Sequence, residues 1–331
     1  MSRYITISRV DGKPGEVYYP LSLRTAPVPT PKPHEVLIKI SAAALNHRDY
    51  FIRKHLYPGT TFGVPLLADG TGTVIGTGTS ASKHWLHKRV VINPGGGWKE
   101  SVEGPEEGRY RLLGGTKYNE KGTLCEYFTI DEGEVEEAPA HLSDVEAAAL
   151  PVTGLTAWRA LITKGGEENS RKGATILVTG IGGGVALMVL KFAVARGADV
   201  WVTSSSQEKL AKAVQLGARG GVSYREANWE EKLLDLLPNK ERRFDAIIDG
   251  AGGDVVEKDV QILKHAAPLA IDIFVKEKQV SPVVSRVVDG MHDLDAIDGL
   301  FQEIQDGGQF GWMGLDALDA LDAPMSKQMS E

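Results

Sequence analysis

The stretch "VTGIGGGVALMVLKFA", residues 178–193, limits the possible folds of this chain more than any other feature. Four glycines occupy five positions between a run of β-branched residues and a long apolar segment. This order predicts a strand over Thr175–Thr179, a turn over Gly180–Gly184 and a helix from Val185, so that backbone N–H groups at the helix start can face an anion. A phosphate-binding loop is therefore the favoured interpretation, and a glycine-rich turn that binds nothing stays open as the alternative.

Strands and helices alternate with short loops from residue 174 to residue 253. Such alternation is typical of right-handed βαβ units, in which helices cover a parallel sheet. The strands are expected in "ATILVTG", "ADVWVTSSS", "GGVSY" and "FDAIIDGAGG". The helices are expected in "VALMVLKFAVARG", "QEKLAKAVQLG" and "WEEKLLDLL". The first of these helices is apolar nearly all round, which predicts burial on several sides. A glycine loop inside a βαβαβ series strengthens the interpretation as a nucleotide site.

The first 140 residues are β-rich instead. Short strands bounded by glycine and proline are expected in "HEVLIKISAAALN", "GTGTVIGTG", "HKRVVINPGGG" and "GTLCEYFTI", which favours a partly open barrel. Apolar residues alternate from Val36 to Ile40, as in a half-buried strand. A helical segment follows over residues 142–166, opened by a capping box of Ser143 and Glu146 and divided by Pro151.

The composition narrows the class of protein. With 331 residues, 42% of them hydrophobic and 24% charged, the chain matches an ordinary soluble protein and is long enough for two domains. A net charge of -7 gives no sign of a nucleic-acid or anionic-membrane partner. The single cysteine, Cys125, excludes an internal disulfide and fits a reducing compartment. No apolar run approaches a signal region or the ~18 residues of a membrane span, so a cytoplasmic protein is expected.

The order of these features resembles the medium-chain dehydrogenase/reductase superfamily. A β-rich domain, "GTLCEYFTI", "ALPVTGLTAWRAL" and "VTGIGGGVALMVLKFA" follow one another as in its zinc-independent quinone oxidoreductase branch, over residues 1–264 and again 275–311. The resemblance implies an α/β fold with a Rossmann parallel sheet, helices on both faces, over residues 143–281. It also implies a GroES-like β-barrel catalytic domain made from residues 1–142 and 282–331. In that family the active site lies in the cleft between the domains, and members are usually homodimers.

The zinc ligands of related dehydrogenases are missing at the positions that the resemblance assigns to them. Those relatives use a cysteine after the first long strand and a later Gly-His-Glu motif. Asn46 stands at the cysteine position here, and Leu67, Ala68 and Asp69 stand at the motif. At most one carboxylate remains, whereas a catalytic zinc ion takes three protein ligands. No metal is therefore expected.

The nicotinamide cofactor is predicted to be NADP(H). NAD enzymes of this fold place an acidic residue after the second Rossmann strand, where it binds the ribose 2′-hydroxyl. Here "ADVWVT" runs into "SSSQEKL" without an acid at the strand end, and Ser204 and Lys209 can bind a 2′-phosphate by hydrogen bond and charge. The alternatives are a capping box of Ser205 and Glu208 and a solvated helix charge at Lys209.

The resemblance supplies the other cofactor contacts. NADPH-preferring relatives carry a phosphate-contacting tyrosine at the position of Tyr224, and their helix start at the position of Thr153 lines the nicotinamide. The strand that ends at Asp249 meets the cofactor ribose. The predicted cofactor-binding residues are Gly180, Gly182, Gly183, Gly184, Val185, Ser204, Lys209, Tyr224, Thr153, Asp249, Gly250 and Ala251.

The resemblance implies hydride transfer from NADPH to a quinone or to the β-carbon of an α,β-unsaturated carbonyl. Without zinc, hydrogen-bond donors must stabilise the charge that develops on the substrate oxygen. The candidate catalytic residues are Asn46, Tyr50 and Arg48 in "NHRDYFIRKHLYPG", which lies at the cleft in this family. A capping Asn, a packed Tyr and a surface Arg are their structural alternatives.

Two other functions stay open. One is a catalytically impaired NADPH-binding family member, from a truncated gene model, a splice variant or a pseudoenzyme. The other is an enoyl reductase that acts on a carrier-bound thioester and shares the fold. The expected substrate of the leading interpretation is a small carbonyl compound or quinone, with neither nucleic acid nor membrane as a partner.

Two departures from the family pattern predict a shortened chain. After "ILKHAAP", near residue 268, the sequence runs into "LAIDIFVKEKQVSP", which reads as a helix, where relatives hold two further strands, one of them used in dimer pairing. About 30–50 residues are missing, judged by the ~30 residues of a βαβ unit. "QFG" is followed by "WMGLDALDALDAP" instead of a closing strand, and the period of three predicts a poorly ordered tail. Loss of these strands would expose a sheet edge.

Overall fold

The computed structural model describes residues 1–101, 103–106, 108–239, 243–250, 255–264, 284–289, 291, 293–306 and 312–316. Contacts between residues divide the chain into two compact units. The first unit takes residues from both chain ends, Met1–Val152, Val284–Gly308 and Trp312–Glu331. The second unit is the middle of the chain, Thr153–Val283, with Gln309–Gly311.

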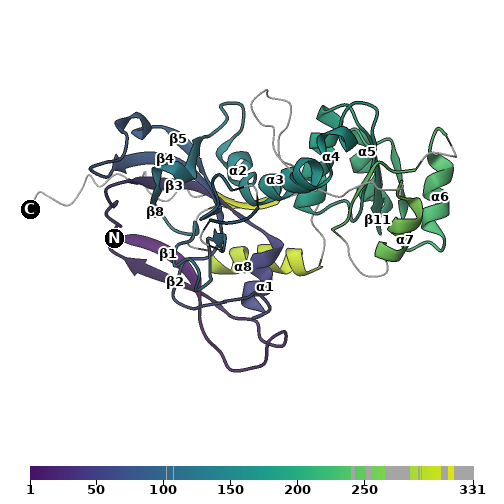
Figure 1. The fold of residues 1–331 in the computed structure, drawn as a ribbon. Coiled ribbons are helices and arrows are strands. Elements are labelled where there is room, and N and C mark those ends of the chain that lie inside the picture. The colour runs from purple at the N-terminus through teal and green to yellow at the C-terminus, as the bar shows by residue number, and fades with distance from the viewer. Residues whose placement is uncertain are drawn as a thin grey trace, which may run out of the picture. The chain divides into compact units, whose positions relative to one another are not determined.

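A seven-stranded sheet forms the body of the first unit (Figure 1). Its strand order is β15-β16-β3-β4-β5-β9, and β8 also pairs with β3, whereas β1–β2 and β6–β7 form separate antiparallel pairs. The strands are β1 Ser2–Ile7, β2 Leu21–Ala26, β3 Glu35–Leu45, β4 Asp69–Thr77, β5 Arg89–Ile92, β6 Gly95–Gly96, β7 Arg111–Leu112, β8 Tyr127–Asp131, β9 Val135–Glu137, β15 Val284–Asp289 and β16 Trp312–Asp316. The helices are α1 His47–Arg53, α2 Asp144–Ala148 and α8 Leu294–Asp306. The predicted β-rich character of this part of the chain is confirmed.

Strand β3 lies at the centre of this sheet. Its side chains Val36, Ile38 and Ile40 are buried, as the alternation predicted, and every residue over Ala42–Leu45 is buried as well. β4 pairs with β3 along one edge. The other edge is divided between two strands, because β8 pairs with Glu35–Lys39 and β16 pairs with Ala42–Leu45.

The expectation that no closing strand follows residue 311 is wrong for Trp312–Asp316. This segment is β16, which pairs antiparallel with β3 and parallel with β15. The reason is non-local: the backbone groups of Ala42–Leu45 are buried and need hydrogen-bond partners, which a local sequence pattern does not reveal. The rest of the predicted irregular tail, after residue 316, lies outside the described residues.

Arg53 joins the two chain ends within the first unit. Its side chain is only 2% exposed; Nε donates to the Tyr19 carbonyl at 2.9 Å, and Nη1 forms a 2.6 Å ion pair with Asp298 of α8. Aromatic rings enclose the guanidinium, whose central carbon lies 3.9 Å from the ring centroid of Tyr18 and 4.7 Å from that of Phe301. A planar cation that donates in several directions and stacks on rings fits this position, so α8 is fixed to the segment around α1.

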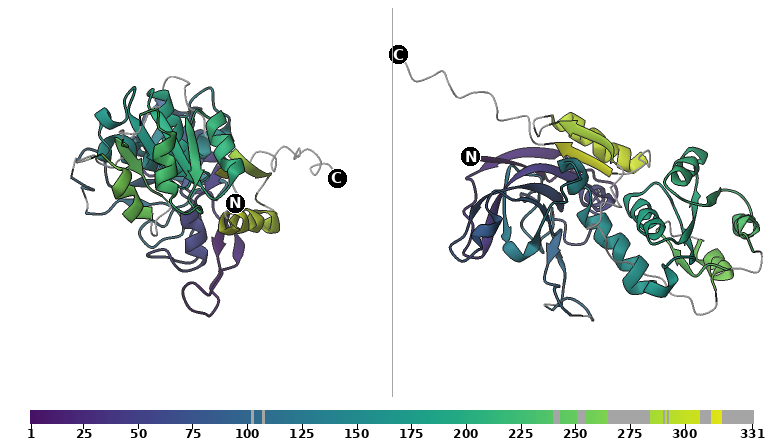
Figure 2. Two further views of the ribbon diagram at one scale, coloured as in Figure 1. Left: turned by 90° about the vertical axis from the view of Figure 1, so that its right-hand side faces the viewer. Right: turned by 90° about the horizontal axis from the view of Figure 1, so that it is seen from above.

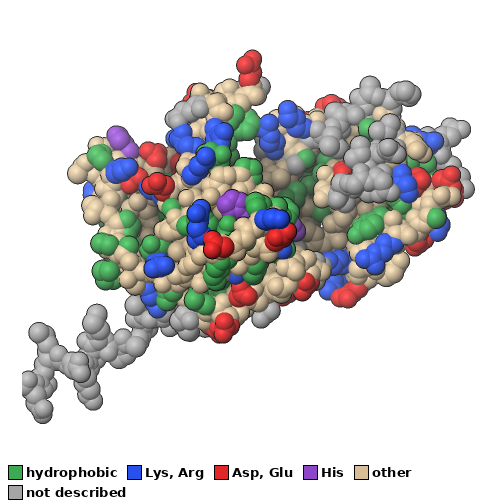
Figure 3. All heavy atoms as spheres, turned by 90° about the horizontal axis from the view of Figure 1, so that it is seen from below, with side chains coloured by type: hydrophobic (Ala, Val, Ile, Leu, Met, Phe, Trp, Pro, Cys, Tyr) green, Lys and Arg blue, Asp and Glu red, His purple; other side chains and the backbone are tan. Residues whose placement is uncertain are grey.

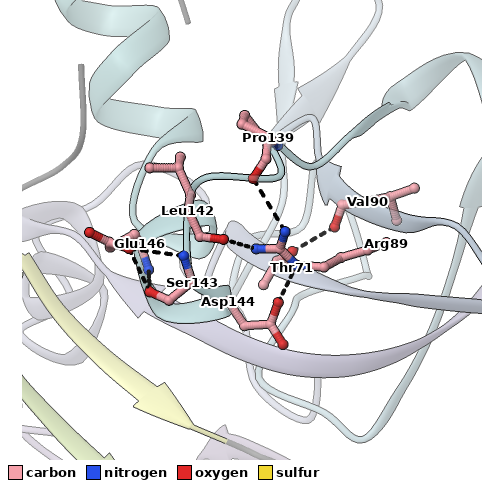
Figure 4. Close-up of polar contacts among 8 residues, drawn as sticks. All are labelled: Thr71, Arg89, Val90, Pro139, Leu142, Ser143, Asp144 and Glu146. Atoms are coloured by element: carbon pink, nitrogen blue, oxygen red, sulfur yellow. Dashed lines mark hydrogen bonds and ion pairs between the residues drawn. The ribbon is translucent and has the colours of Figure 1, made fainter. Parts of the chain in front are cut away.

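The start of helix α2 is closed by its predicted cap and is held on the sheet by Arg89 of β5 (Figure 4). The Ser143 N–H donates to the Glu146 carboxylate at 2.9 Å, and the Ser143 hydroxyl oxygen accepts the Glu146 N–H at 3.3 Å, which confirms the capping box. Arg89 pairs with Asp144 and also donates to the Leu142 carbonyl at 2.5 Å. The start of α2 is therefore fixed at both its backbone and its side chains.

The second unit is built on a four-stranded parallel sheet of order β12-β11-β10-β13. The strands are β10 Thr175–Val178, β11 Asp199–Ser204, β12 Gly220–Ser223 and β13 Ala246–Ile248. The helices are α3 Pro151–Trp158, α4 Gly184–Ala195, α5 Gln207–Gln215, α6 Trp229–Leu236 and α7 Val255–Ile262. α4 and α5 lie on one side of the sheet, and α6 and α7 lie on the other (Figures 1 and 2). The predicted alternation of strands and helices is confirmed.

Helix α4 packs inside the second unit, as its apolar sequence predicted. Its buried residues are Leu187, Met188, Val189, Leu190, Phe192 and Ala193. The helix expected over residues 269–282 lies outside the described residues.

Replacing Leu315 with proline tests strand β16. Because β16 lies between β15 and β3, each of its interior N–H groups faces one neighbour or the other. Proline removes one ladder hydrogen bond and leaves a buried acceptor unpaired, which destabilises the chain by about 2–3 kcal/mol. We expect the midpoint of urea unfolding to fall for Leu315→Pro and to stay near that of the wild type for Leu315→Val. Equal midpoints for wild type and Leu315→Pro would show that this edge of β3 needs no partner.

Candidate functional site

The glycine loop joins β10 to α4 in the second unit. Gly180 and Gly182 have φ angles of 61° and 130°, which favour glycine. α4 begins at Gly184, one residue earlier than expected, and the first N–H to bond back along the helix is that of Leu187, to the Gly183 carbonyl. The N–H groups of residues 184–186 precede that bond and lie at the positive end of the helix dipole. This arrangement is suited to bind an anion.

Lys209 of α5 lies against this loop. A Cβ atom on Gly182 would be 2.8 Å from Cδ and 3.2 Å from Nζ of Lys209, so the lysine occupies the space that a side chain would need. Burial lowers the pKa of Lys209. Its neighbour Glu208 pairs with Lys212 at 2.7 Å. A positive charge is therefore placed at the glycine loop.

The predicted capping box of Ser205 and Glu208 is wrong. The cap is Ser206, whose hydroxyl oxygen accepts the Lys209 N–H at 3.4 Å. The reason is that β11 runs through Ser204 and α5 starts at Gln207, which leaves Ser206 in the capping position.

Ser204 and Tyr224 adjoin the loop from the neighbouring strands. The Ser204 hydroxyl donates to the Ile181 carbonyl at 3.4 Å and accepts the Ser206 N–H at 3.3 Å. The Tyr224 N–H donates to the Ser204 carbonyl at 3.2 Å, and the Tyr224 side chain is exposed. The structure thus brings the loop, Ser204, Lys209 and Tyr224 together at the carboxyl ends of β10, β11 and β12. In a doubly wound sheet this is the edge at which nucleotides bind.

Asp249 and Gly250 are tied to the end of β10 by Thr179. The Thr179 hydroxyl donates to the Asp249 carboxylate and accepts the Gly250 N–H at 3.1 Å. Asp259 of α7, which sequence reasoning missed, is buried, and burial together with Asp249 raises the pKa of Asp259 to about 7. A regular helix pattern gives no sign of such a carboxyl.

Two further residues were predicted to contact the cofactor. Thr153 is buried in α3, whereas Ala251 lies outside the described residues.

A second polar centre lies in the first unit around Asp69. Asn46 caps α1, and its Nδ2 donates to Asp69 Oδ2 at 2.7 Å. The Val152 N–H donates to Asp69 Oδ1 at 2.8 Å. The Asp69 side chain is fully buried, and this burial raises its pKa to about 7 despite the two hydrogen bonds, with the nearby Asp49 acting in the same direction.

Asp49 and Arg48 extend this centre. Asp49 accepts the Asn46 N–H at 2.8 Å and Arg48 Nη1 at 2.9 Å, and burial raises its pKa. Arg48 Nη2 donates to the Gly114 carbonyl at 2.9 Å. Arg48 is therefore a buried residue that supports the cluster, and the alternative of a surface arginine is wrong.

Tyr50 is the third candidate of the α1 segment. Its ring packs near Tyr18, His47 and Phe51, with centroid separations of 6.2, 5.9 and 5.9 Å. Within the part of the chain that the structure describes, its hydroxyl has no hydrogen-bond partner, whereas the polar ends of Asn46 and Arg48 are engaged. Of the three candidates, Tyr50 is thus the one whose polar group is not held by another residue, although the buried Arg48 Nε also lacks a hydrogen-bond partner among the described residues.

The residues at the expected zinc positions do not fit a zinc ion. Ala68 has no donor atom, and Asn46 and Asp69 bond to each other. Leu67 is buried and holds a φ of 64°, an uncommon angle for a bulky residue, where the backbone carries the chain into β4. Among the described residues no three His, Cys, Asp or Glu side chains are grouped to hold a metal ion.

The described residues include no helix that is long and apolar enough to cross a membrane.

Two family models match the chain. The model for the "Alcohol dehydrogenase GroES-like domain" matches residues 32–140, and the model for "Zinc-binding dehydrogenase" matches residues 184–280. A solved NAD-dependent alcohol dehydrogenase is similar over 95% of this chain and 99% of its own, with a TM-score of 0.77 and 27% identity. The predicted fold class, a GroES-like domain with a Rossmann parallel sheet, is confirmed.

Three curated relatives show the range of similarity. The zinc-type alcohol dehydrogenase-like protein YogA of Leptosphaeria maculans is 43% identical over 93% of this chain and 97% of its own length. The 2-methylene-furan-3-one reductase of Solanum lycopersicum is 32% identical over 74% of this chain and 56% of its own length. The quinone oxidoreductase of Pongo abelii is 27% identical over 74% of this chain and 66% of its own length.

The alignment with the Leptosphaeria protein is longer than the chain itself, 350 residues against 331. That relative therefore contains residues that have no counterpart here. This supports the expectation of a shortened chain; most of the segment that follows the join near residue 268 lies outside the described residues.

The raised pKa of Asp69 predicts that stability depends on pH. The pKa is about 7 in the folded chain, against an ordinary value of 3.8, so the folded chain keeps a proton that the unfolded chain releases. The resulting stabilisation is complete below about pH 4 and is lost as the pH rises to about 7. We expect the unfolding free energy to fall more steeply over this range in the wild type than in Asp69→Asn, by about 1.4 kcal/mol per pH unit.

Urea unfolding at several pH values measures this difference. Asp11→Asn makes the same chemical change at an exposed position and should leave the wild-type profile unaltered. Parallel profiles for wild type and Asp69→Asn would contradict the assignment of a protonated carboxyl.

Proposed function

This chain belongs to the medium-chain dehydrogenase/reductase superfamily, in its quinone oxidoreductase-like branch, and on that premise we propose that it is an NADPH-dependent reductase of quinones or α,β-unsaturated carbonyls that works without zinc. The tomato and orangutan relatives support the acceptor class, because a 2-methylene-furan-3-one and a quinone are both conjugated carbonyl compounds. Such acceptors take up a hydride at carbon and gather negative charge on oxygen.

The position of Lys209 against the glycine loop carries the proposal. A lysine there can pair with the 2′-phosphate that distinguishes NADPH from NADH. Ser204 ends the neighbouring strand β11 and bonds the loop at the Ile181 carbonyl, and the exposed Tyr224 side chain, just after β12, can donate a hydrogen bond to a phosphate. The residues between Ser204 and Gln207 include no carboxylate that would repel a phosphate. The N–H groups at the start of α4 would hold the pyrophosphate. When bound, NADPH supplies the hydride.

The Asn46–Asp69 hydrogen bond supports a zinc-independent reaction. This hydrogen bond engages the side chains of Asn46 and Asp69, which stand at two of the positions where zinc-dependent relatives hold metal ligands. Ala68 has no side-chain atom that could bind a metal at the third position. The stabilisation of negative charge on the substrate must then come from hydrogen-bond donors of the chain.

Tyr50 is the proposed proton donor. Its hydroxyl has no partner among the described residues, whereas Asn46 and Arg48 are held by Asp69 and Asp49. Asn46 and Arg48 act in this proposal as positioning residues, which fix the start of α1 and so the ring of Tyr50, four residues after Asn46.

A second candidate function is NADPH binding without turnover. One observation favours it, namely that the Leptosphaeria relative contains residues with no counterpart here. Binding of NADPH without reduction of any member of a panel of quinones and enals would support this candidate over the first.

Lys209→Ala tests the cofactor assignment. Loss of a charged hydrogen-bond donor should weaken NADPH binding about ten- to hundred-fold and leave NADH binding unchanged, because only NADPH carries the 2′-phosphate. Quenching of protein fluorescence by each cofactor gives the two affinities. Lys212→Ala is the matched control, since Lys212 lies on the same helix but pairs with Glu208. Equal affinity of the wild type for NADPH and NADH would refute the assignment.

Tyr50→Phe tests the proton donor. The change removes only the hydroxyl, so kcat for an enone should fall about a hundred-fold while NADPH affinity and the thermal midpoint stay constant. Tyr18→Phe is the matched control, because the neighbouring Tyr18 hydroxyl is buried and burial raises the pKa of Tyr18 to about 12. An unchanged kcat in Tyr50→Phe would assign the proton to another donor.

A further inference from the structure

We propose that the β1–β2 pair of the first unit carries a binding site for an organic anion, distinct from the nucleotide loop of the second unit. A cavity of ≈ 470 Å³ opens at this pair, and its walls include Tyr4, Thr6, Ser8, Arg9, Arg24 and Phe62. Cavities of this size are in the range that small ligands occupy.

The strand register builds one face of the site. Ile5 and Ile7 of β1 are buried in the core, and Tyr4 and Thr6 alternate with them along the strand. Ile7 also borders the cavity. Arg24 of β2 is directly opposite Tyr4 in the antiparallel ladder, which places their Cβ atoms about 5 Å apart. The face is therefore presented by paired strands that are anchored in the core.

The charge of the cavity is positive and uncompensated. Arg9 and Arg24 lie in its walls, and its walls contain no carboxylate. Within the described part of the chain neither arginine forms an ion pair, although the chain as a whole carries a net charge of -7. On the face shown in Figure 3, for comparison, basic and acidic side chains are interspersed. Two guanidinium groups without a counter-ion favour the binding of an anion, with hydrogen bonds that the charges strengthen.

Ring contacts set the class of the anion. The Arg9 guanidinium carbon lies 5.0 Å from the centroid of the Phe62 ring, a stacking that leaves the N–H groups at the edge of the guanidinium able to donate. Tyr4 adds a second ring to the walls. The Thr6 side chain is 1% exposed, and its hydroxyl has no partner among the described residues, so a polar group lies in the floor. These walls fit a planar organic ring that bears a carboxylate or a phosphate.

Isothermal titration calorimetry with phenyl phosphate, benzoate and inorganic phosphate tests the site. The titrations use the full chain at low salt in the Lys209→Ala background, which removes the lysine from the nucleotide loop. Loss of binding in the cavity variants then assigns the heat to the cavity, whatever the outcome for the proposed function. We expect phenyl phosphate or benzoate to bind at least ten-fold more tightly than inorganic phosphate. Arg24→Gln and Arg9→Gln should each weaken that binding at least ten-fold.

Arg171→Gln is the matched control, an exposed arginine of the second unit outside the cavity, and it should leave the affinity unchanged. Thermal midpoints of the variants should equal that of the parent, because Arg9 and Arg24 are exposed. Equal weakening by Arg171→Gln, or no loss in either cavity variant, would show non-specific attraction and overturn the proposal. Equal affinity for inorganic phosphate would overturn the ring-bearing class of ligand, and the stronger of the two organic probes identifies the anionic group.

Discussion

The backbone of Ala42–Leu45 needs hydrogen-bond partners, and the architecture of the first unit depends on how they are supplied. These residues are buried, and β8 pairs only with the earlier part of the same edge of β3. An unpaired buried N–H or carbonyl costs about 1–3 kcal/mol, so the groups of this segment that face away from β4 cannot be left without partners. Strand β16 provides the partners from the other end of the chain. Arg53 reinforces the same connection through Asp298 of α8, with an aromatic enclosure that a lysine would not match.

The two polar centres of the protein differ in kind. At the glycine loop, backbone N–H groups and Lys209 present positive charge at the ends of the strands, which is the chemistry of anion binding. Around Asp69, a buried carboxyl is held by Asn46 and by the N–H of Val152, and its raised pKa means that the charged form is costly there. The first centre is suited to hold a nucleotide, and the second is a rigid support from which α1 and α3 both begin.

The glycine loop, the parallel strands and the capping box of α2 were predictable because each depends on residues close in sequence. A strand followed by a glycine turn and an apolar helix has few alternative folds. The pairing of β16 with β3 was not predictable, since it depends on buried backbone groups more than 250 residues away. Asn46 and Asp69 were identified from the sequence as the residues at the zinc-ligand positions. The hydrogen bond between their side chains was not predictable, because it depends on the path of the chain between them, through Leu67. The cap of α5 was misplaced by one residue because three consecutive serines are chemically equivalent there.

The division of one β3 edge between β8 and β16 has a consequence for how the protein is made. The strands β3, β4 and β8 all leave the ribosome early, and β8 can cover its part of the edge at once. The remaining part, beside Ala42–Leu45, stays open through the synthesis of the whole second unit, until β16 emerges. An apolar strand edge left open for that time is a template for pairing with other chains. The nascent chain is thus most exposed to aggregation while its second unit is folding, and this exposure ends only when β15, α8 and β16 pack onto the first unit.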